Sequence, residues 1–150
     1  MSRPERSAEI AALYQELILD HYRRPRNKGT LEHADASVEI KNPDCGDEIT
    51  LQVAFDGNGI GDVRFCGSGC SISQASASMM TQLVKGKPIE EIDALRNRFR
   101  EMILGDQSAV TDEKLGSLRA LSGVTRFPGR VRCALLAWNA LESALAERGE

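Results

Sequence analysis

Hydrophobic positions recur with a helical period near the N-terminus of the chain. Apolar side chains lie three and four residues apart over residues 10–18, and this spacing predicts an amphipathic helix that ends before Pro25. The apolar positions of this helix are Ile10, Leu13, Tyr14, Leu17 and Ile18.

The period then changes to two, which is typical of half-buried β-strands. Apolar residues alternate with polar ones over residues 37–41, 48–55 and 63–65. Between the second and third segments, the sequence Asp-Gly-Asn-Gly at 56–59 is a strong turn signal. The pattern predicts three antiparallel strands that form a sheet with one face in water.

A helical period returns in the C-terminal half of the chain. Apolar positions over residues 72–83 predict a helix that stops before Pro88, and a further helix is expected over about residues 89–103. The glycine-punctuated stretch 105–123 is expected to hold only a short helix between loops. Pro128 suits the first turn of the last helix, because proline is favoured there. The apolar stripe of that helix comprises Val131, Leu135, Trp138, Leu141 and Leu145.

Strands that cluster early, with helices around them, indicate the α+β class: a small three-stranded antiparallel sheet packed with about five helices. A length of 150 residues suits a single domain, 1–150, with a real hydrophobic core. The net charge of −3 gives no basic excess that would indicate nucleic-acid binding. No apolar run approaches the ~20 residues of a membrane span, and residues 1–9 lack the apolar core of a secretory signal. We therefore expect a cytoplasmic protein with no membrane partner.

Three of the four cysteines adjoin turn-forming residues or predicted helix starts. Cys45 and Asp47 are expected in the turn between the first two strands. Cys70 lies at a strand-to-helix junction, and Cys133 lies near the start of the last helix. Helix N-termini favour thiolates, and three thiolates with one carboxylate suit a tetrahedral zinc ion. The spacing matches no zinc finger. Three buried structural cysteines, with Asp47 as a turn residue, therefore remain an equal alternative at this point.

The other candidate ligands carry weaker signals. Cys66 continues the strand after Phe65, so it points to the face opposite Val63 and Phe65 and is expected to fill space. His21 lies on the first predicted helix and is expected to be structural or on the surface. His33 lies in a polar connector and is expected to be exposed.

Several sequence blocks, in order, resemble a known family. They lie at residues 13–27, 42–47 (Asn-Pro-Asp-Cys-Gly-Asp), 69–80 and 130–136 (Arg-Val-Arg-Cys-Ala-Leu-Leu). Together they resemble the IscU/NifU N-terminal superfamily of iron–sulfur cluster assembly proteins, and its SufU branch in particular.

Two departures from IscU scaffolds favour the SufU branch. IscU-type scaffolds carry a histidine immediately before the last cysteine, where this chain has Arg132. They also carry a Leu-Pro-Pro-Val-Lys chaperone-docking motif just upstream, where this chain has Phe-Pro-Gly-Arg-Val at 127–131. In addition, residues 95–123 resemble the extra segment that is typical of SufU proteins.

The resemblance implies a SufE/NifU-like α+β fold and a zinc ion held by a defined set of ligands. By match to the family motifs, these ligands are Cys45, Asp47, Cys70 and Cys133. Cys66 has no counterpart among the motif cysteines. The implied activity is that of a sulfurtransferase, which accepts persulfide sulfur from a SufS-type, pyridoxal-phosphate-dependent cysteine desulfurase. Downstream iron–sulfur assembly proteins are the further partners that this activity implies.

A persulfide relay would require one ligand to leave the metal, and Cys45 is the expected one because it lies on a glycine-containing turn. Its thiolate would attack the persulfide of the desulfurase by chemistry analogous to thiol–disulfide exchange. Arg130 and Arg132 would then dock the partner or stabilise charge, with surface solubility as the alternative. Two other functions stay open: a scaffold that holds a transient iron–sulfur cluster, and an adaptor with a purely structural zinc.

Overall fold

The computed structural model of the chain describes residues 14–43 and 46–148. A helix over residues 14–23 comes first and ends before Pro25, as predicted; Ile10 and Leu13 lie outside the described residues. The remaining elements, in chain order, are β1 (Ala36–Asn42), β2 (Asp47–Asp56), β3 (Gly59–Ser68), α2 (Ser71–Val84), α3 (Ile89–Ile103), α4 (Gln107–Val110), the 3₁₀ run η1 (Glu113–Arg126) and α5 (Pro128–Arg148).

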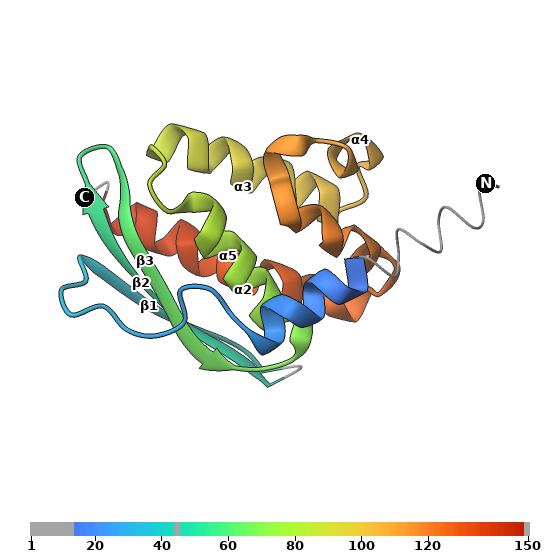
Figure 1. The fold of residues 1–150 in the computed structure, drawn as a ribbon, viewed down its shortest axis with the longest axis horizontal. Coiled ribbons are helices and arrows are strands. Elements are labelled where there is room, and N and C mark those ends of the chain that lie inside the picture. Colours follow the sequence, from blue (N-terminus) through green and yellow to red (C-terminus); the bar gives the residue numbers. More distant parts are fainter. Residues whose placement is uncertain (1–13, 44–45, 149–150) are drawn as a thin grey trace.

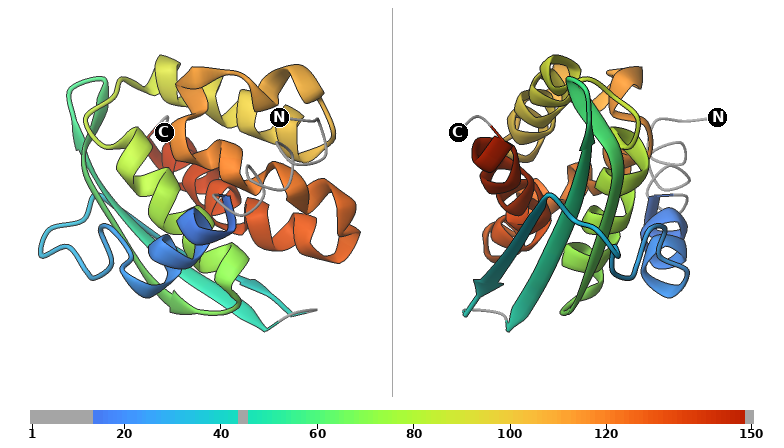
Figure 2. Two further views of the ribbon diagram at one scale, coloured as in Figure 1. Left: turned by 45° about the vertical axis from the view of Figure 1, so that its right-hand side comes forward. Right: turned by 90° about the vertical axis from the view of Figure 1, so that its left-hand side faces the viewer.

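The sheet has the order β1-β2-β3, and both strand pairs are antiparallel. Leu51 at its centre pairs with Val38 on one side and with Phe65 on the other. The alternate residues Ile49, Leu51 and Val53 are fully buried, because α2 and α5 cover this face of the sheet (Figures 1 and 2). The predicted α+β class with a three-stranded antiparallel sheet is confirmed.

A segment that the periodicity did not predict runs along the free edge of β3. Phe65 N donates to Asn27 O at 3.0 Å and Gly29 N donates to Phe65 O at 2.8 Å, which makes a short parallel bridge at Lys28. A single bridge has no alternation of apolar and polar residues, so it leaves no period in the sequence. It ties the connection after the first helix to the sheet.

Helix α2 is buried on nearly every side. Besides the predicted apolar stripe, its polar residues Ser73, Gln74, Ser76, Ser78 and Thr81 are buried. A hydroxyl group can be buried at little cost when it makes hydrogen bonds to neighbouring groups. Ser76 Oγ, for example, donates to Ala134 O on α5 at 2.7 Å.

His21 is a structural residue, in agreement with one of the two expectations for it. Its side chain is 2% exposed, and Nδ1 lies 2.8 Å from Ser78 Oγ on α2. Arg26 N donates to the same hydroxyl at 2.8 Å. The end of the first helix is therefore fastened to α2. His33 is exposed, as expected.

The expectation of a single short helix between loops over residues 105–123 is wrong. This stretch holds α4 and most of η1, which bends at Gly116 with φ 53° and ψ −129°. Leu115, Leu118 and Leu121 are fully buried, and their three-residue spacing is the period of a 3₁₀ helix. Gly116 marks a bend between helical turns rather than a loop.

The last helix begins at Pro128, as predicted. Trp138 on α5 stacks on Phe99 of α3 with ring centroids 5.2 Å apart, which joins the two helices. None of the helices in the described part of the chain is both long and apolar enough to span a membrane.

Candidate metal centre

Three elements bring potential metal ligands together. Asp47 is the first residue of β2, Cys70 is the N-cap of α2, and Cys133 lies near the start of α5. One ligand atom from each lies within 4.8 Å of the others. The starts of β2 and α2 lie at the same end of the sheet (Figure 1). Asp47 and Cys133 are buried and Cys70 is half-buried, so the donors face one another inside the protein.

Asp47 departs from the sequence expectation in one detail. The sequence predicts it in the turn between the strands, whereas it is the first paired residue of β2, opposite Asn42. Its carboxylate is 1% exposed. An ionised carboxylate at this depth requires hydrogen bonds or a cation for compensation.

The Asp47 carboxylate spans the gap between β2 and α2. Its Oδ1 accepts a hydrogen bond from Cys70 N at 2.7 Å, and its Oδ2 lies 3.7 Å from Cys70 Sγ. One oxygen therefore orients the carboxylate on the backbone, which leaves the other oxygen directed toward the sulfur atoms. Carboxylates that bind metals are commonly oriented by a hydrogen bond in this way.

Gly69 makes this approach possible. A Cβ atom at this position would collide with Asp47 Oδ1 and would lie 2.7 Å from Ser73 Oγ. Because real Cβ atoms do not come so close to other atoms, the carboxylate and the hydroxyl can share this space only beside a glycine. Sequence reasoning missed both Gly69 and Ser73; the available signal was the Gly-Ser-Gly run that precedes Cys70.

The donor set fits zinc on its chemistry and its spacing. Zinc binds thiolates at ~2.3 Å and carboxylate oxygen at ~2.0 Å, so a tetrahedral site separates a sulfur and an oxygen ligand by about 3.5 Å. The observed separation of Cys70 Sγ from Asp47 Oδ2 is 3.7 Å. Two sulfurs and one oxygen would leave one of four positions for a further donor.

Cys45, the fourth predicted ligand, lies outside the described residues. Gly46, the described residue that follows it, has φ 71°, and its N–H donates to Asn42 O at 2.9 Å. This bond closes the connection between β1 and β2.

Asp47, Cys70 and Cys133 form the donor cluster of this site. The other described residues that the sequence analysis singled out do not belong to it. Arg130 and Arg132 are exposed on the first turns of α5 and precede the buried Cys133 in the chain. Phe127, just before α5, is 61% exposed. Cys66 is half-buried and alternates with the buried Val63 and Phe65, as expected for the opposite face of the strand.

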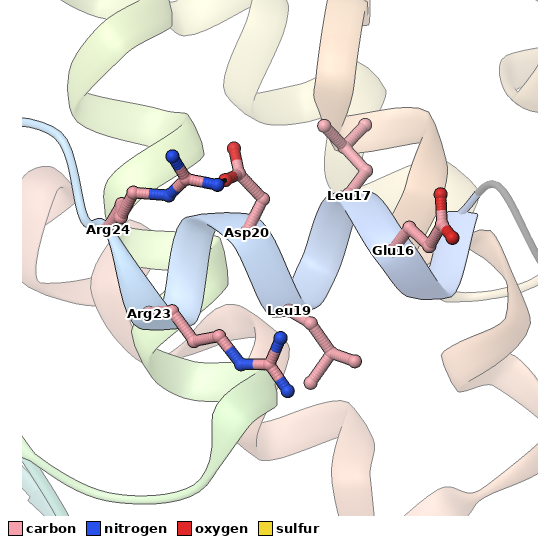
Figure 3. Close-up of a pocket in the computed structure, with 6 residues that line it drawn as sticks. All are labelled: Glu16, Leu17, Leu19, Asp20, Arg23 and Arg24. Atoms are coloured by element: carbon pink, nitrogen blue, oxygen red, sulfur yellow. Dashed lines mark ion pairs between the residues drawn. The ribbon is translucent and has the colours of Figure 1, made fainter.

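A surface hollow of about 500 Å³ lies elsewhere, along the helix of residues 14–23. Figure 3 shows its lining: Asp20 and Arg24 form an ion pair of 3.1 Å, while Leu19 and Arg23 extend from the other side of the helix. None of its lining residues belongs to the donor cluster. Its walls carry mainly exposed charges from one helix, so it is a weaker candidate for chemistry.

Comparison with known proteins places the chain in a family. Residues 13–134 match the model of the NifU-like N terminal domain. The chain therefore belongs to the NifU-like N-terminal family, which confirms the resemblance to the IscU/NifU superfamily.

Individual relatives carry two different functional names. The chain is 45% identical over 141 residues to the zinc-dependent sulfurtransferase SufU of Bacillus subtilis (strain 168), with 94% of this chain and 95% of the relative covered. It is 47% identical over 138 residues to the iron-sulfur cluster assembly scaffold protein IscU of Streptococcus pyogenes serotype M1, with 92% and 86% covered. Identity alone does not separate these two functions.

A solved structure shares the fold. It is that of a protein from Fervidobacterium islandicum AW-1 named as a candidate iron–sulfur cluster assembly scaffold for the SUF system. The two structures superpose with a TM-score of 0.80 and 40% sequence identity, over 87% of this chain and 94% of the other.

Proposed function

We propose that this chain is a zinc-dependent sulfurtransferase that accepts persulfide sulfur from a SufS-type cysteine desulfurase for iron–sulfur cluster assembly. The observation that carries the proposal is the buried cluster of Asp47, Cys70 and Cys133, with ligand atoms within 4.8 Å of one another. The similarity to the B. subtilis SufU supports zinc as the metal and sulfur transfer as the activity.

In this proposal Asp47, Cys70 and Cys133 hold the zinc and Cys45 completes the set. Bound zinc would supply the positive charge that keeps the cysteines as thiolates. Asp47 is oriented for this role by the Cys70 backbone N–H, at 2.7 Å from Oδ1. Burial of the site excludes water from most of the donor atoms, which strengthens their attraction to a cation.

Cys45 is the proposed acceptor of sulfur. The other three donors are fixed in β2, α2 and α5, whereas Cys45 precedes Gly46 in the β1–β2 connection. Its thiolate attacks the outer sulfur of the partner's persulfide, so that a new S–S bond forms at Cys45. The S–S bond of the partner breaks, and the partner's cysteine leaves as a thiolate. The sulfane sulfur moves with no net oxidation or reduction.

The test is the acceleration of desulfurase turnover by this protein, with Cys45→Ser and Cys66→Ser as a matched pair. Cys66→Ser removes a half-buried thiol outside the donor cluster and should keep full stimulation. Cys45→Ser should abolish stimulation, and mass spectrometry should locate the persulfide of the wild-type protein on Cys45. Full stimulation by a folded Cys45→Ser variant would eliminate the relay.

An iron–sulfur scaffold is the second candidate, and the similarity to the S. pyogenes IscU favours it. Three cysteines and an aspartate can hold a labile cluster, because clusters are bound mainly by thiolates. Metal analysis of protein purified without oxygen separates the two functions. Stoichiometric zinc supports the sulfurtransferase, whereas iron with acid-labile sulfide supports the scaffold. A purely structural zinc predicts that ligand substitutions lower stability and that none removes sulfur transfer selectively.

A further inference from the structure

Ser73 lies beside the donor cluster, and no role has been assigned to it so far. It lies in the first turn of α2 and is fully buried. Its hydroxyl donates to Cys70 O at 3.1 Å and lies 3.9 Å from Cys70 Sγ. It also occupies the space beside Gly69 into which Asp47 Oδ1 projects. The hydroxyl therefore adjoins both the sulfur and the carboxylate.

Gln74 restricts how this hydroxyl can bond. Gln74 is 4% exposed, and its Nε2 donates to Ser73 Oγ at 3.4 Å. Its Oε1 is buried and finds no hydrogen-bond partner among the described residues. A buried amide carbonyl without a partner costs free energy, and such a group in a native fold calls for an explanation. The amide is held here in the orientation that donates to Ser73.

The direction of the Ser73–Cys70 contact depends on the state of the sulfur. A thiol can donate to the serine oxygen, but a metal-bound sulfur has no proton and can only accept. Gln74 donates to Ser73 Oγ and so does not take the serine proton. Cys70 O and Cys70 Sγ both lie where they can accept it, at 3.1 and 3.9 Å. Rotation about one bond moves this proton from the carbonyl to the sulfur.

We propose that Ser73, supported by Gln74, is a positioning residue of the metal centre that donates a hydrogen bond to the metal-bound sulfur of Cys70. The inference rests on the proposed zinc site. The Gly69–Ser73 turn would then have two roles. It leaves room for the Asp47 carboxylate, and it fixes the position of the Cys70 sulfur. Outer-shell hydrogen bonds of this kind typically change metal affinity by 10–100-fold.

The first experiment measures zinc affinity by competition with a chromophoric chelator. Ser73→Ala should weaken zinc binding about tenfold. Ser78→Ala is the matched control, because Ser78 is an equally buried hydroxyl on the same helix that bonds His21 and Arg26 instead of the donor cluster. It should keep the wild-type affinity, although it loses hydrogen bonds of its own. Equal losses in both variants would overturn the proposal, since they would reflect helix stability alone.

The second experiment uses Co²⁺ in place of zinc and records the sulfur-to-cobalt charge-transfer band. A hydrogen bond stabilises the sulfur lone pairs, so its loss in Ser73→Ala should shift the band to lower energy, with no shift in Ser78→Ala. Gln74→Met should give a smaller shift in the same direction, because it removes only the donor to Ser73. An unshifted band in Ser73→Ala overturns the proposal, and if that variant does not fold, an unshifted band in Gln74→Met does.

These outcomes separate the inference from the proposed function. A wild-type protein that takes up neither zinc nor Co²⁺ would remove the metal site itself. A wild-type protein that binds both metals, with variants that leave the band unshifted, would remove only the role of Ser73.

Discussion

Asp47 contacts Cys70 twice, through its two carboxylate oxygens. Oδ1 accepts from the backbone N–H of Cys70 at 2.7 Å, and Oδ2 lies 3.7 Å from its sulfur. One side chain on the sheet thereby fixes both the start of α2 and a face of the donor cluster. The two contacts are separable by substitution.

Replacement of Asp47 by asparagine should separate metal binding from fold stability. Asn keeps an oxygen for the Cys70 N–H but places an amide nitrogen, which is not a metal ligand, where Oδ2 stood. Zinc affinity should fall by more than the roughly tenfold expected of an outer-shell change, while the stability of the metal-free protein stays close to wild type. Asp47→Ala should lose the hydrogen bond as well and cost the metal-free protein about 1.5–3 kcal/mol.

Chelator competition and urea unfolding of metal-free protein provide the two readouts. If Asp47→Asn bound zinc as tightly as the wild type, the carboxylate would not be a ligand. If Asp47→Ala and Asp47→Asn were equally stable without metal, the bond to the Cys70 N–H would contribute nothing to the fold.

Gly69→Ala should destabilise the protein and remove zinc binding. The new Cβ would overlap Asp47 Oδ1 and crowd Ser73 Oγ, so the carboxylate would have to leave its place. Gly105→Ala is the control, because Gly105 has φ 113° but an added Cβ there would meet no atom within 4 Å. The control should lose only the ~1–3 kcal/mol typical of backbone strain and should keep its zinc. Thermal unfolding and metal content measure both effects; a zinc-loaded Gly69→Ala protein would refute this account of the glycine.

The sheet could be predicted from the sequence because its strands are buried on one side. In β3, Val63 and Phe65 are fully buried, whereas Cys66, the residue after Phe65, is half-buried. This alternation is visible in the sequence as a period of two. The stretch around Gly116 was harder to predict, because a glycine in a bend between 3₁₀ turns has the same sequence signal as a glycine in a loop.

The approach of Asp47 to Cys70 could not be predicted from periodicity. The two residues are 23 positions apart, and a local pattern does not say which ends of distant elements meet. Sequence reasoning grouped the ligands from their chemistry, with buried structural cysteines as an equal alternative, and the family resemblance favoured the metal site. The structure brings Asp47, Cys70 and Cys133 together; their role as zinc ligands, and that of Cys45, stays a prediction.

His21 should make the stability of the metal-free protein depend on pH. Burial, with a smaller contribution from Arg26, lowers the pKa of His21 from 6.5 to about 4. Below pH 6.5 the unfolded chain binds a proton at this imidazole that the folded chain accepts only near pH 4. Stability that is fully present above pH 6.5 should therefore be lost as the pH falls to 4, by up to about 3 kcal/mol.

The His21→Gln variant tests this dependence. Its free energy of unfolding in urea should change less between pH 6.5 and 4 than that of the wild type, because the imidazole that takes up a proton on unfolding is absent. His33→Gln provides the control for removal of an exposed imidazole. Parallel curves for wild type and His21→Gln would show that His21 titrates alike in the folded and unfolded states.

Arg130→Ala should weaken the interaction with the desulfurase without changing the metal site. Arg130 is exposed one helical turn before the buried Cys133, next to the exposed Phe127. A charge at the rim of an interface acts chiefly on encounter and is worth about 1 kcal/mol or less. The concentration for half-maximal stimulation should therefore rise up to about fivefold, with less dependence on salt, while maximal stimulation and zinc content stay unchanged.

Arg100→Ala removes an exposed arginine from α3 and controls for the change in net charge. It should leave the half-maximal concentration at the wild-type value. If Arg130→Ala lowered maximal stimulation at an unchanged half-maximal concentration, the guanidinium would act on the transferring sulfur instead of on docking. That result would place Arg130 beside the reacting atoms, because a charge that only guides encounter cannot change the rate once the complex is saturated.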